Sequence, residues 1–236
     1  MKIVIPGGSG HVGQLLARHF VNSGEEVLVL SRGDYTGAGR GVRWDGKTLD
    51  DWASEIDGAD VVINLAGRTV DCRYNATNRR QIMDSRVDST RLVGEAIAKA
   101  SNPPAVWLQM STATIYAHTL GPAHDEASRN FGGTEPDVSD TWNFSIDVAS
   151  NWEAAATQAD TPDTRLVLLR SAMVMQPDDG SVFRVLSRLV RLGLGGSVGG
   201  GRQFVSWMHG DDFARAIRHI IDTNCRPPPT LPPRPR

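Results

Sequence analysis

A glycine-rich turn between a strand and a helix constrains the fold of this chain more than any other feature. Gly7-Gly-Ser-Gly10-His-Val-Gly13 follows a short apolar run at 2–6 and precedes a segment, 11–23, with apolar residues at helical spacing. Glycines at these three positions permit a tight turn, close approach of the backbone to a diphosphate, and close packing of helix on strand. The turn therefore predicts a dinucleotide site, contacted by Gly7, Ser9, Gly10, His11, Val12 and Gly13.

Strand and helix patterns then alternate along the chain. Apolar runs at 27–30, 61–66, 106–110 and 166–169 are separated or followed by helical patterns at 77–100, 144–159 and 213–221. Alternation of this kind predicts an α/β, Rossmann-type doubly wound parallel sheet with helices on both faces. We expect one such domain over 1–225. The remaining segment, 226–236, carries six prolines and no periodicity, so we expect an extended, disordered tail there.

Charge and cysteine content narrow the possible partners and compartment. A formal net charge of −2 argues against a nucleic-acid or anionic-membrane partner. No apolar run reaches the length of roughly 18–20 residues that a membrane helix needs. The two cysteines, Cys72 and Cys225, lie far apart and have no metal-ligand spacing. They indicate unpaired thiols in a reducing compartment, so we expect a cytoplasmic protein without a metal site.

The residues after the second predicted strand favour one cofactor over another. A site specific for NAD usually carries an acidic residue there, which binds the ribose hydroxyls. This chain has Ser31-Arg32 instead, and a hydroxyl with a guanidinium suits the 2′-phosphate of NADP. A solvated surface arginine is the alternative interpretation. The sequence therefore predicts NADP(H) as the cofactor.

Several motifs together resemble the extended short-chain dehydrogenase/reductases, and more closely their atypical epimerase family branch. They are the glycine turn, Asn64-Leu-Ala-Gly67, Asp84-Ser-Arg86, Ser111-Thr-Ala-Thr-Ile-Tyr116, Asn151-Trp-Glu-Ala154 and Gln203-Phe-Val-Ser-Trp-Met-His209. The resemblance implies that Leu65, Ala66, Gly67 and Ser111 line the cofactor. It also places Arg86, as a further cofactor residue, where the family usually has Asn, and implies that Asp45 approaches the adenine. A local role as a loop acid is the alternative for Asp45.

The same resemblance exposes a gap in the catalytic residues. In the family, a Ser or Thr at the end of the fourth strand works with a Y-x-x-x-K pair, whose lysine lowers the pKa of the tyrosine for proton transfer. Thr112 matches the Ser or Thr position. The positions of the tyrosine and the lysine fall near Ser145 and Ala149, which are neither residue. Tyr116 lies in a family motif and is the candidate proton donor that remains, with plain packing beside the strand end as its alternative.

Two functions from different classes fit these observations. One is an NADP(H)-dependent oxidoreductase or epimerase-like enzyme with a carbonyl or nucleotide-sugar substrate, and the other is a non-catalytic NADP(H) sensor or scaffold. Family members of this kind continue past the Asp212 region into a carboxy-terminal substrate lobe, whereas this chain becomes proline-rich after Asn224. We therefore expect that lobe to be reduced or missing. The long helix at 77–100 is a candidate homodimer contact.

Overall fold

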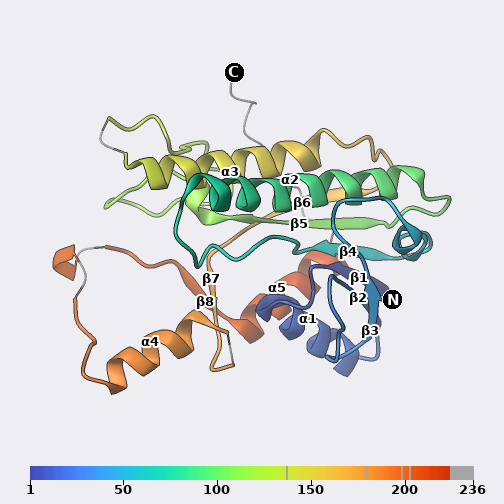
Figure 1. The fold of residues 1–236 in the computed structure, drawn as a ribbon, viewed down its shortest axis with the longest axis horizontal. Helices are drawn as coiled ribbons and strands as arrows, with labels where there is room; N and C mark the ends of the chain where they lie inside the picture. Colours follow the sequence, from blue (N-terminus) through green and yellow to red (C-terminus); the bar gives the residue numbers. More distant parts are fainter. Residues whose placement is uncertain (137, 179, 198, 202, 224–236) are drawn as a thin grey trace.

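The computed structural model describes residues 1–223 except 137, 179, 198 and 202. Its main feature is a six-stranded sheet in the order β3-β2-β1-β4-β5-β6, in which every pair of neighbours is parallel (Figure 1). The strands are β1 (Lys2–Pro6), β2 (Glu26–Ser31), β3 (Arg40–Arg43), β4 (Val61–Asn64), β5 (Val106–Thr112) and β6 (Arg165–Ser171). The parallel sheet predicted from the alternating patterns is confirmed.

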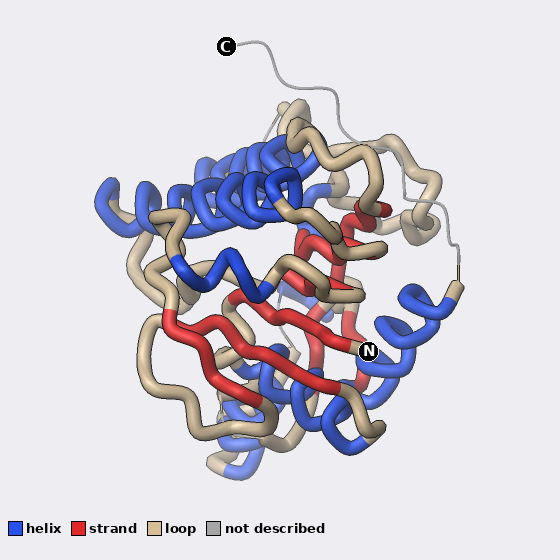
Figure 2. Tube along the Cα trace, turned by 90° about the vertical axis from the view of Figure 1, so that its right-hand side faces the viewer, coloured by secondary structure: helices blue, strands red, loops and turns tan. Residues whose placement is uncertain are grey.

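Helices cover both faces of this sheet (Figures 1 and 2). They are α1 (His11–Asn22), α2 (Ala76–Lys99), α3 (Asp140–Thr157) and α5 (Gly210–Asp222). Successive side chains of a strand point to opposite faces. In β1, Ile3 and Ile5 therefore pack with α1 and α5, whereas Val4 packs with α2, α3 and the short helix η1 (Asp51–Glu55). The two resulting cores enclose the sheet between them.

The strand order reverses direction at β1, which pairs with β2 on one side and with β4 on the other. The carboxyl ends of parallel strands lie at one edge of a sheet, and a crevice forms there at such a switch point. The turn after β1 consequently lies beside the segment after β4, although nearly sixty residues separate them. Topology alone thus brings the two predicted cofactor segments together.

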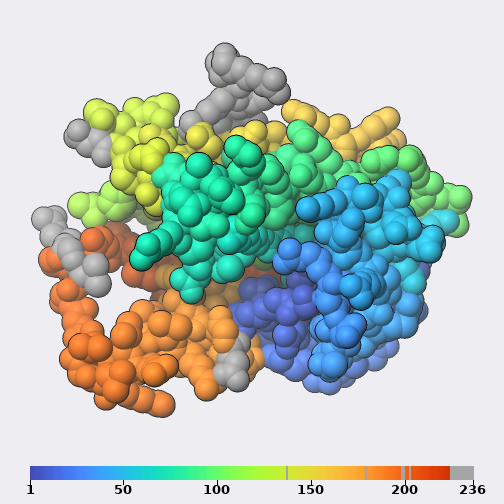
Figure 3. Space-filling view, viewed as in Figure 1, coloured from blue at the N-terminus to red at the C-terminus, as the bar shows by residue number. Residues whose placement is uncertain are grey.

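A second, smaller unit of structure follows β6. It contains the parallel pair β7 (Met173–Met175) and β8 (Trp207–His209), and the helix α4 (Val182–Arg191). None of the residues of α4 is buried. Figures 1 and 3 show α4, in orange, projecting beyond the sheet and its helices, whereas Val174 of β7 and Met208 of β8 pack against the core. The sequence patterns had not predicted these elements. The expected tail at 226–236 lies outside the described residues.

In the described part of the chain, none of the helices combines the length and the apolar character that crossing a bilayer requires.

Candidate functional site

The glycine turn has the geometry that its spacing predicts. Gly7 has a φ of +75°, and a Cβ there would lie 2.6 Å from the Cα of Ala66. A Cβ at Gly13 would lie 2.4 Å from the Cα of Gly8. Because backbone atoms occupy both positions, neither tolerates a side chain without displacement of the chain. These two glycines therefore hold the turn against β4 and α1 against the turn.

Gly10 serves a different purpose. It is the N-cap residue of α1, and no side chain caps the amides of the first helical turn. A Cβ at Gly10 would meet only the carbonyl oxygen of Gly7, at 3.7 Å. The amides at this helix end consequently face open space, and the helix dipole favours an anion there. On this observation, the turn and the start of α1 fit the diphosphate of a dinucleotide.

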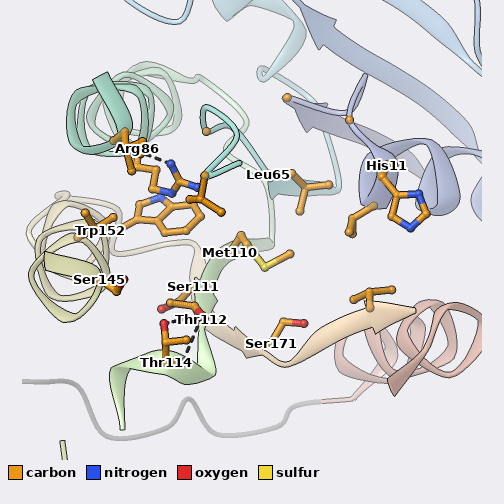
Figure 4. A pocket seen from close by; sticks show the side chains of 18 of the residues that line it. His11, Leu65, Arg86, Met110, Ser111, Thr112, Thr114, Ser145, Trp152 and Ser171 are labelled. Atoms are coloured by element: carbon orange, nitrogen blue, oxygen red, sulfur yellow. Dashed lines mark hydrogen bonds between the residues drawn. The ribbon is translucent and has the colours of Figure 1, made fainter. Parts of the chain in front are cut away.

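A cavity of about 620 Å³ runs from this turn to the end of β5 (Figure 4). It is bordered by the segment after β4 and by residues of α2 and α3. The predicted site residues that line it are Gly7, Gly10, His11, Val12, Gly13, Leu65, Gly67, Arg86, Ser111 and Thr112. The structure therefore brings most of the predicted cofactor residues to one space.

A buried amide network holds the segment after β4 in place. The side-chain amide of Asn64 donates to Gln109 Oε1 at 2.9 Å and to Thr90 Oγ1 at 3.2 Å. Its Oδ1 accepts a hydrogen bond from the backbone of Ala66 at 3.1 Å. Ala66 is itself buried behind the cavity wall. The network thus fixes the path of the backbone that presents Leu65 and Gly67 to the cavity.

Five predicted cofactor residues lie outside the lining: Ala66, which is buried behind the cavity wall, and Ser9, Ser31, Arg32 and Asp45. Ser9 is exposed, and its carbonyl accepts from Gln14. Ser31 is buried at the end of β2, where its hydroxyl accepts from the Gly33 amide at 3.4 Å. Arg32 is exposed, and no described residue pairs with it. Since the amide of Gly7 donates to Leu30 at 3.0 Å, the end of β2 lies directly beside the glycine turn.

Asp45 has a local role. Its Oδ1 accepts hydrogen bonds from the backbone amides of Lys47, at 2.7 Å, and Thr48, at 2.9 Å. Its Oδ2 accepts from the hydroxyl of Thr48. These hydrogen bonds lower the pKa of the Asp45 carboxyl, and the bond from the Lys47 amide has the largest effect. Asp45 therefore has the turn role that was its alternative interpretation, and its position near adenine stays a prediction.

Thr112 and Ser111 end β5 at the floor of the cavity. Thr112 caps the short helix η2 (Ala113–Ile115), and its Oγ1 accepts from the Thr114 amide at 3.2 Å. The hydroxyls of Thr112 and Thr114 lie 2.9 Å apart. The hydroxyl of Ser111 instead donates to Glu153 Oε1 at 2.6 Å. Thr112 and Thr114 therefore offer the cavity a short chain of hydroxyls.

Tyr116 does not reach this cavity. It lines a second one, of about 1070 Å³, whose wall includes residues of β6 and α5. Its hydroxyl accepts from Arg170 Nη1 at 3.0 Å, and its ring stacks on His124 and Phe131. The expectation that Tyr116 stands beside Thr112 as a proton donor is corrected accordingly. The short helix η2 turns the chain between the two residues, and the ring of Tyr116 packs in the second cavity.

Arg170 also forms a buried ion pair with Glu153. Its Nε and Nη2 each donate to a carboxylate oxygen of Glu153 at 2.8 Å, and the side chains are 4% and 2% exposed. Burial lowers the pKa of the Arg170 guanidinium, but the hydrogen bonds with Glu153 and Tyr116 outweigh burial and the net shift is upward. Because Glu153 also accepts from Ser111, this pair connects the walls of the two cavities.

The two positions expected for the tyrosine and lysine pair lie one turn apart on α3. Ser145 lines the cavity and donates its hydroxyl to the carbonyl of Thr141 at 3.1 Å. Ala149 is fully buried. A phenol does line the cavity, but it belongs to Tyr74, in the segment before α2. Position 78, four residues after Tyr74, is Asn and not Lys, so the Y-x-x-x-K spacing does not mark Tyr74, and no other local signal does.

Comparisons with known proteins give a consistent result. A family model described as the NAD dependent epimerase/dehydratase family matches residues 3–230. The human epimerase family protein SDR39U1 is 33% identical over 227 residues, which cover 95% of this chain and 71% of that protein. The epimerase family protein SSP1921 of Staphylococcus saprophyticus is 30% identical over 220 residues, or 93% of this chain and 70% of that protein.

Solved structures agree with these matches. The crystal structure of human epimerase family protein SDR39U1 (isoform 2) with NADPH superposes with a TM-score of 0.80 at 30% identity, covering 95% of this chain and 71% of that one. UDP-glucuronic acid 4-epimerase from Bacillus cereus, in complex with UDP-glucuronic acid and NAD, gives a TM-score of 0.70 at 18% identity, with 96% and 74% covered. At that identity the likeness concerns the fold alone.

Proposed function

We propose a function from one premise: the chain belongs to the NAD dependent epimerase/dehydratase family. In this proposal it binds NADP(H) along the glycine turn and works as an oxidoreductase or epimerase-like enzyme on a carbonyl group. The observation that carries the proposal is the continuous cavity from the uncapped start of α1 to the hydroxyl of Thr112. The human relative crystallised with NADPH supports the choice of cofactor.

Two parts of the chain would hold the cofactor. The amides at Gly10 and the first turn of α1 suit the diphosphate, since no side chain occupies that space. Ser31 and Arg32 suit the 2′-phosphate, with Arg43 as a further cation because β3 pairs it in register with Ser31. The positive charges of Arg32 and Arg43 would attract this phosphate. NAD has a ribose hydroxyl in its place, so these charges would bind no phosphate there.

We expect wild-type protein to bind NADPH more tightly than NADH, and Arg32→Asp to remove or reverse that preference. Losing a charge-assisted contact to the 2′-phosphate should lower the affinity for NADPH by about 1.5–3 kcal/mol, or roughly 10–100-fold. Titration calorimetry with both cofactors measures the effect, and Arg80→Asp on the exposed face of α2 is the matched control. Equal wild-type affinities for the two cofactors would contradict the assignment.

Thr112 is the residue that we assign to the substrate. Its Oγ1 accepts from the Thr114 amide, and when the Thr114 hydroxyl donates across their 2.9 Å contact, the proton of Thr112 is available to the oxygen of a substrate carbonyl. When bound, NADP(H) would supply or accept the hydride at the carbon of that carbonyl. A hydroxyl held by a helix cap keeps one orientation, so it stabilises developing negative charge without reorganising.

Thr112→Val should lower the rate of NADPH oxidation about 100-fold or more, because it removes a positioned donor while keeping the shape of the side chain. Tyr116→Phe should change that rate by less than about threefold, since the Tyr116 hydroxyl lies in the other cavity. Single-turnover measurements over aldehydes, 2-oxo acids and nucleotide sugars provide the rates. A large loss with Tyr116→Phe and none with Thr112→Val would reverse the assignment.

The second candidate is a cofactor-bound sensor or scaffold without turnover. The observation that favours it is the composition of the cavity, because Ser145 and Ala149 occupy the positions expected for the tyrosine and lysine. In that case NADPH would bind with normal affinity, and no carbonyl compound would accelerate its oxidation. The same single-turnover panel therefore separates the two candidates.

A further inference from the structure

The cavity described above has an unusual balance of charge. Among the described residues that line it, none is an aspartate or a glutamate. Its ionisable side chains are His11, Tyr74 and Arg86. Burial lowers the pKa of His11, which favours its neutral imidazole. Among the described lining residues, Arg86 is the one arginine, and there is no lysine beside it.

Hydrogen bonds join Arg86 to the segment that follows β4 and to its own helix. Its Nη1 donates to the carbonyls of Arg68 at 3.0 Å and Ile82 at 3.1 Å. The guanidinium lies over the indole of Trp152, 5.0 Å from the ring centroid. Gly67 also lies close to the guanidinium, because a Cβ there would approach the Arg86 Cζ to 3.1 Å. We call the surroundings formed by Gly67 and Trp152 the guanidinium slot.

No described carboxylate forms an ion pair with Arg86. The contrast with other arginines is clear, since Arg170 pairs with Glu153 and Arg79 pairs with Asp140. The Nε and Nη2 atoms of Arg86 make no hydrogen bond to a described residue. Burial lowers the pKa of Arg86 to about 10, which still leaves it charged near pH 7. Arg86 is partly buried. A partly buried cation without a counter-ion is less well solvated than one at the surface, and an anionic ligand would compensate its charge.

The position of Arg86 separates this charge from the glycine turn. Figure 4 shows Arg86 with Trp152 and Ser145 at one side of the cavity, and His11, at the start of α1, at the other. Leu65 lies between them, and Thr112 lies below on the end of β5. A diphosphate on the first turn of α1 would therefore leave Arg86 available. The charge belongs to the end of the cavity where a substrate carbonyl would contact Thr112.

We propose that the substrate of this cavity is an acidic carbonyl compound, whose carboxylate or phosphate group binds Arg86 while its carbonyl oxygen accepts from Thr112. The planar guanidinium suits either anion, because two of its donors remain for a bidentate contact. The family resemblance implies a cofactor role for Arg86, whereas its place in the cavity favours contact with the substrate. It rests on the proposed function, since the cofactor must occupy the other end of the cavity.

The test measures anion binding to NADPH-saturated protein by titration calorimetry, with malonate, inorganic phosphate and uncharged malonamide as probes. Saturation with NADPH fills the glycine turn, so an anion cannot bind there. We expect malonate or phosphate to bind and malonamide not to bind. Arg86→Met should weaken the anion at least about tenfold and change the affinity for NADPH by less than about threefold. The comparison of malonate with phosphate identifies which anion the guanidinium slot prefers.

Two further variants control the result. Arg80→Met removes an exposed arginine from the same helix and should behave as wild type. Arg86→Lys keeps the charge without the planar fork, and should retain part of the anion affinity. Unchanged anion binding by Arg86→Met, the absence of anion binding by wild type, or an equal loss of NADPH and anion affinity would each overturn the inference. Failure of wild-type protein to bind NADPH would instead contradict the proposed function, and anion titration of the cofactor-free protein would still test Arg86.

Discussion

Replacing Arg170 by methionine is expected to lower the free energy of unfolding by about 3–5 kcal/mol. The side chains of Arg170 and Glu153 are almost completely buried and share two hydrogen bonds of 2.8 Å. Removing the guanidinium leaves the Glu153 carboxylate in the protein interior with Ser111 as a neutral donor. Desolvation of that carboxylate is then uncompensated. Urea denaturation measures the loss, and the slope of the unfolding free energy against urea concentration (the m-value) should stay that of wild type.

Two comparisons make this expectation specific to the buried pair. The double variant Arg170→Met with Glu153→Leu should recover most of the lost stability, because neither charge then remains in the interior. Arg215→Ala breaks an ion pair with Asp212 in which both side chains are more than half exposed, and should change stability by less than about 1 kcal/mol. A loss below about 1 kcal/mol for Arg170→Met would show that the pair contributes no more than a surface contact.

Gly13→Ala should weaken NADPH binding at least about tenfold and also destabilise the fold by about 1–3 kcal/mol. The new methyl group would lie 2.4 Å from the Cα of Gly8 and 2.5 Å from its carbonyl oxygen. Because backbone cannot move aside as a flexible side chain can, α1 must shift away from the turn. Such a shift displaces the amides that we assign to the diphosphate. Calorimetric titration with NADPH and thermal unfolding measure the two effects.

Gly10→Ala separates binding from folding at the same turn. Its methyl group would meet only the Gly7 carbonyl oxygen, at an ordinary contact distance of 3.7 Å, so stability should stay within about 0.5 kcal/mol of wild type. The methyl group would nevertheless fill the space over the first turn of α1 and weaken NADPH binding. Gly196→Ala, with nothing within 4 Å, should change neither quantity. Unchanged NADPH affinity in Gly10→Ala would mean that the diphosphate does not approach this turn.

The amino-acid sequence was sufficient to predict the framework of the site. The order of glycines in the turn, and the alternation of strand and helix patterns, depend on residues close together in the chain. For that reason they predicted the parallel sheet and the position of Gly7, Gly10 and Gly13 at its first strand. The end of β5 could also be located, because Thr112 directly follows an apolar run. These local features were therefore enough to predict the residues of the turn and of the end of β5 that line the cavity.

The direction and partner of individual side chains depended on the tertiary structure. Tyr116 lies four residues after Thr112, yet η2 turns its ring into the second cavity. Tyr74 reaches the first cavity only because the segment before α2 packs against Phe144 of α3. The pairing of Arg170 with Glu153 requires β6 to lie beside β5 and α3. Contacts between elements that are distant in the chain decide such features, and no local pattern of residues records them.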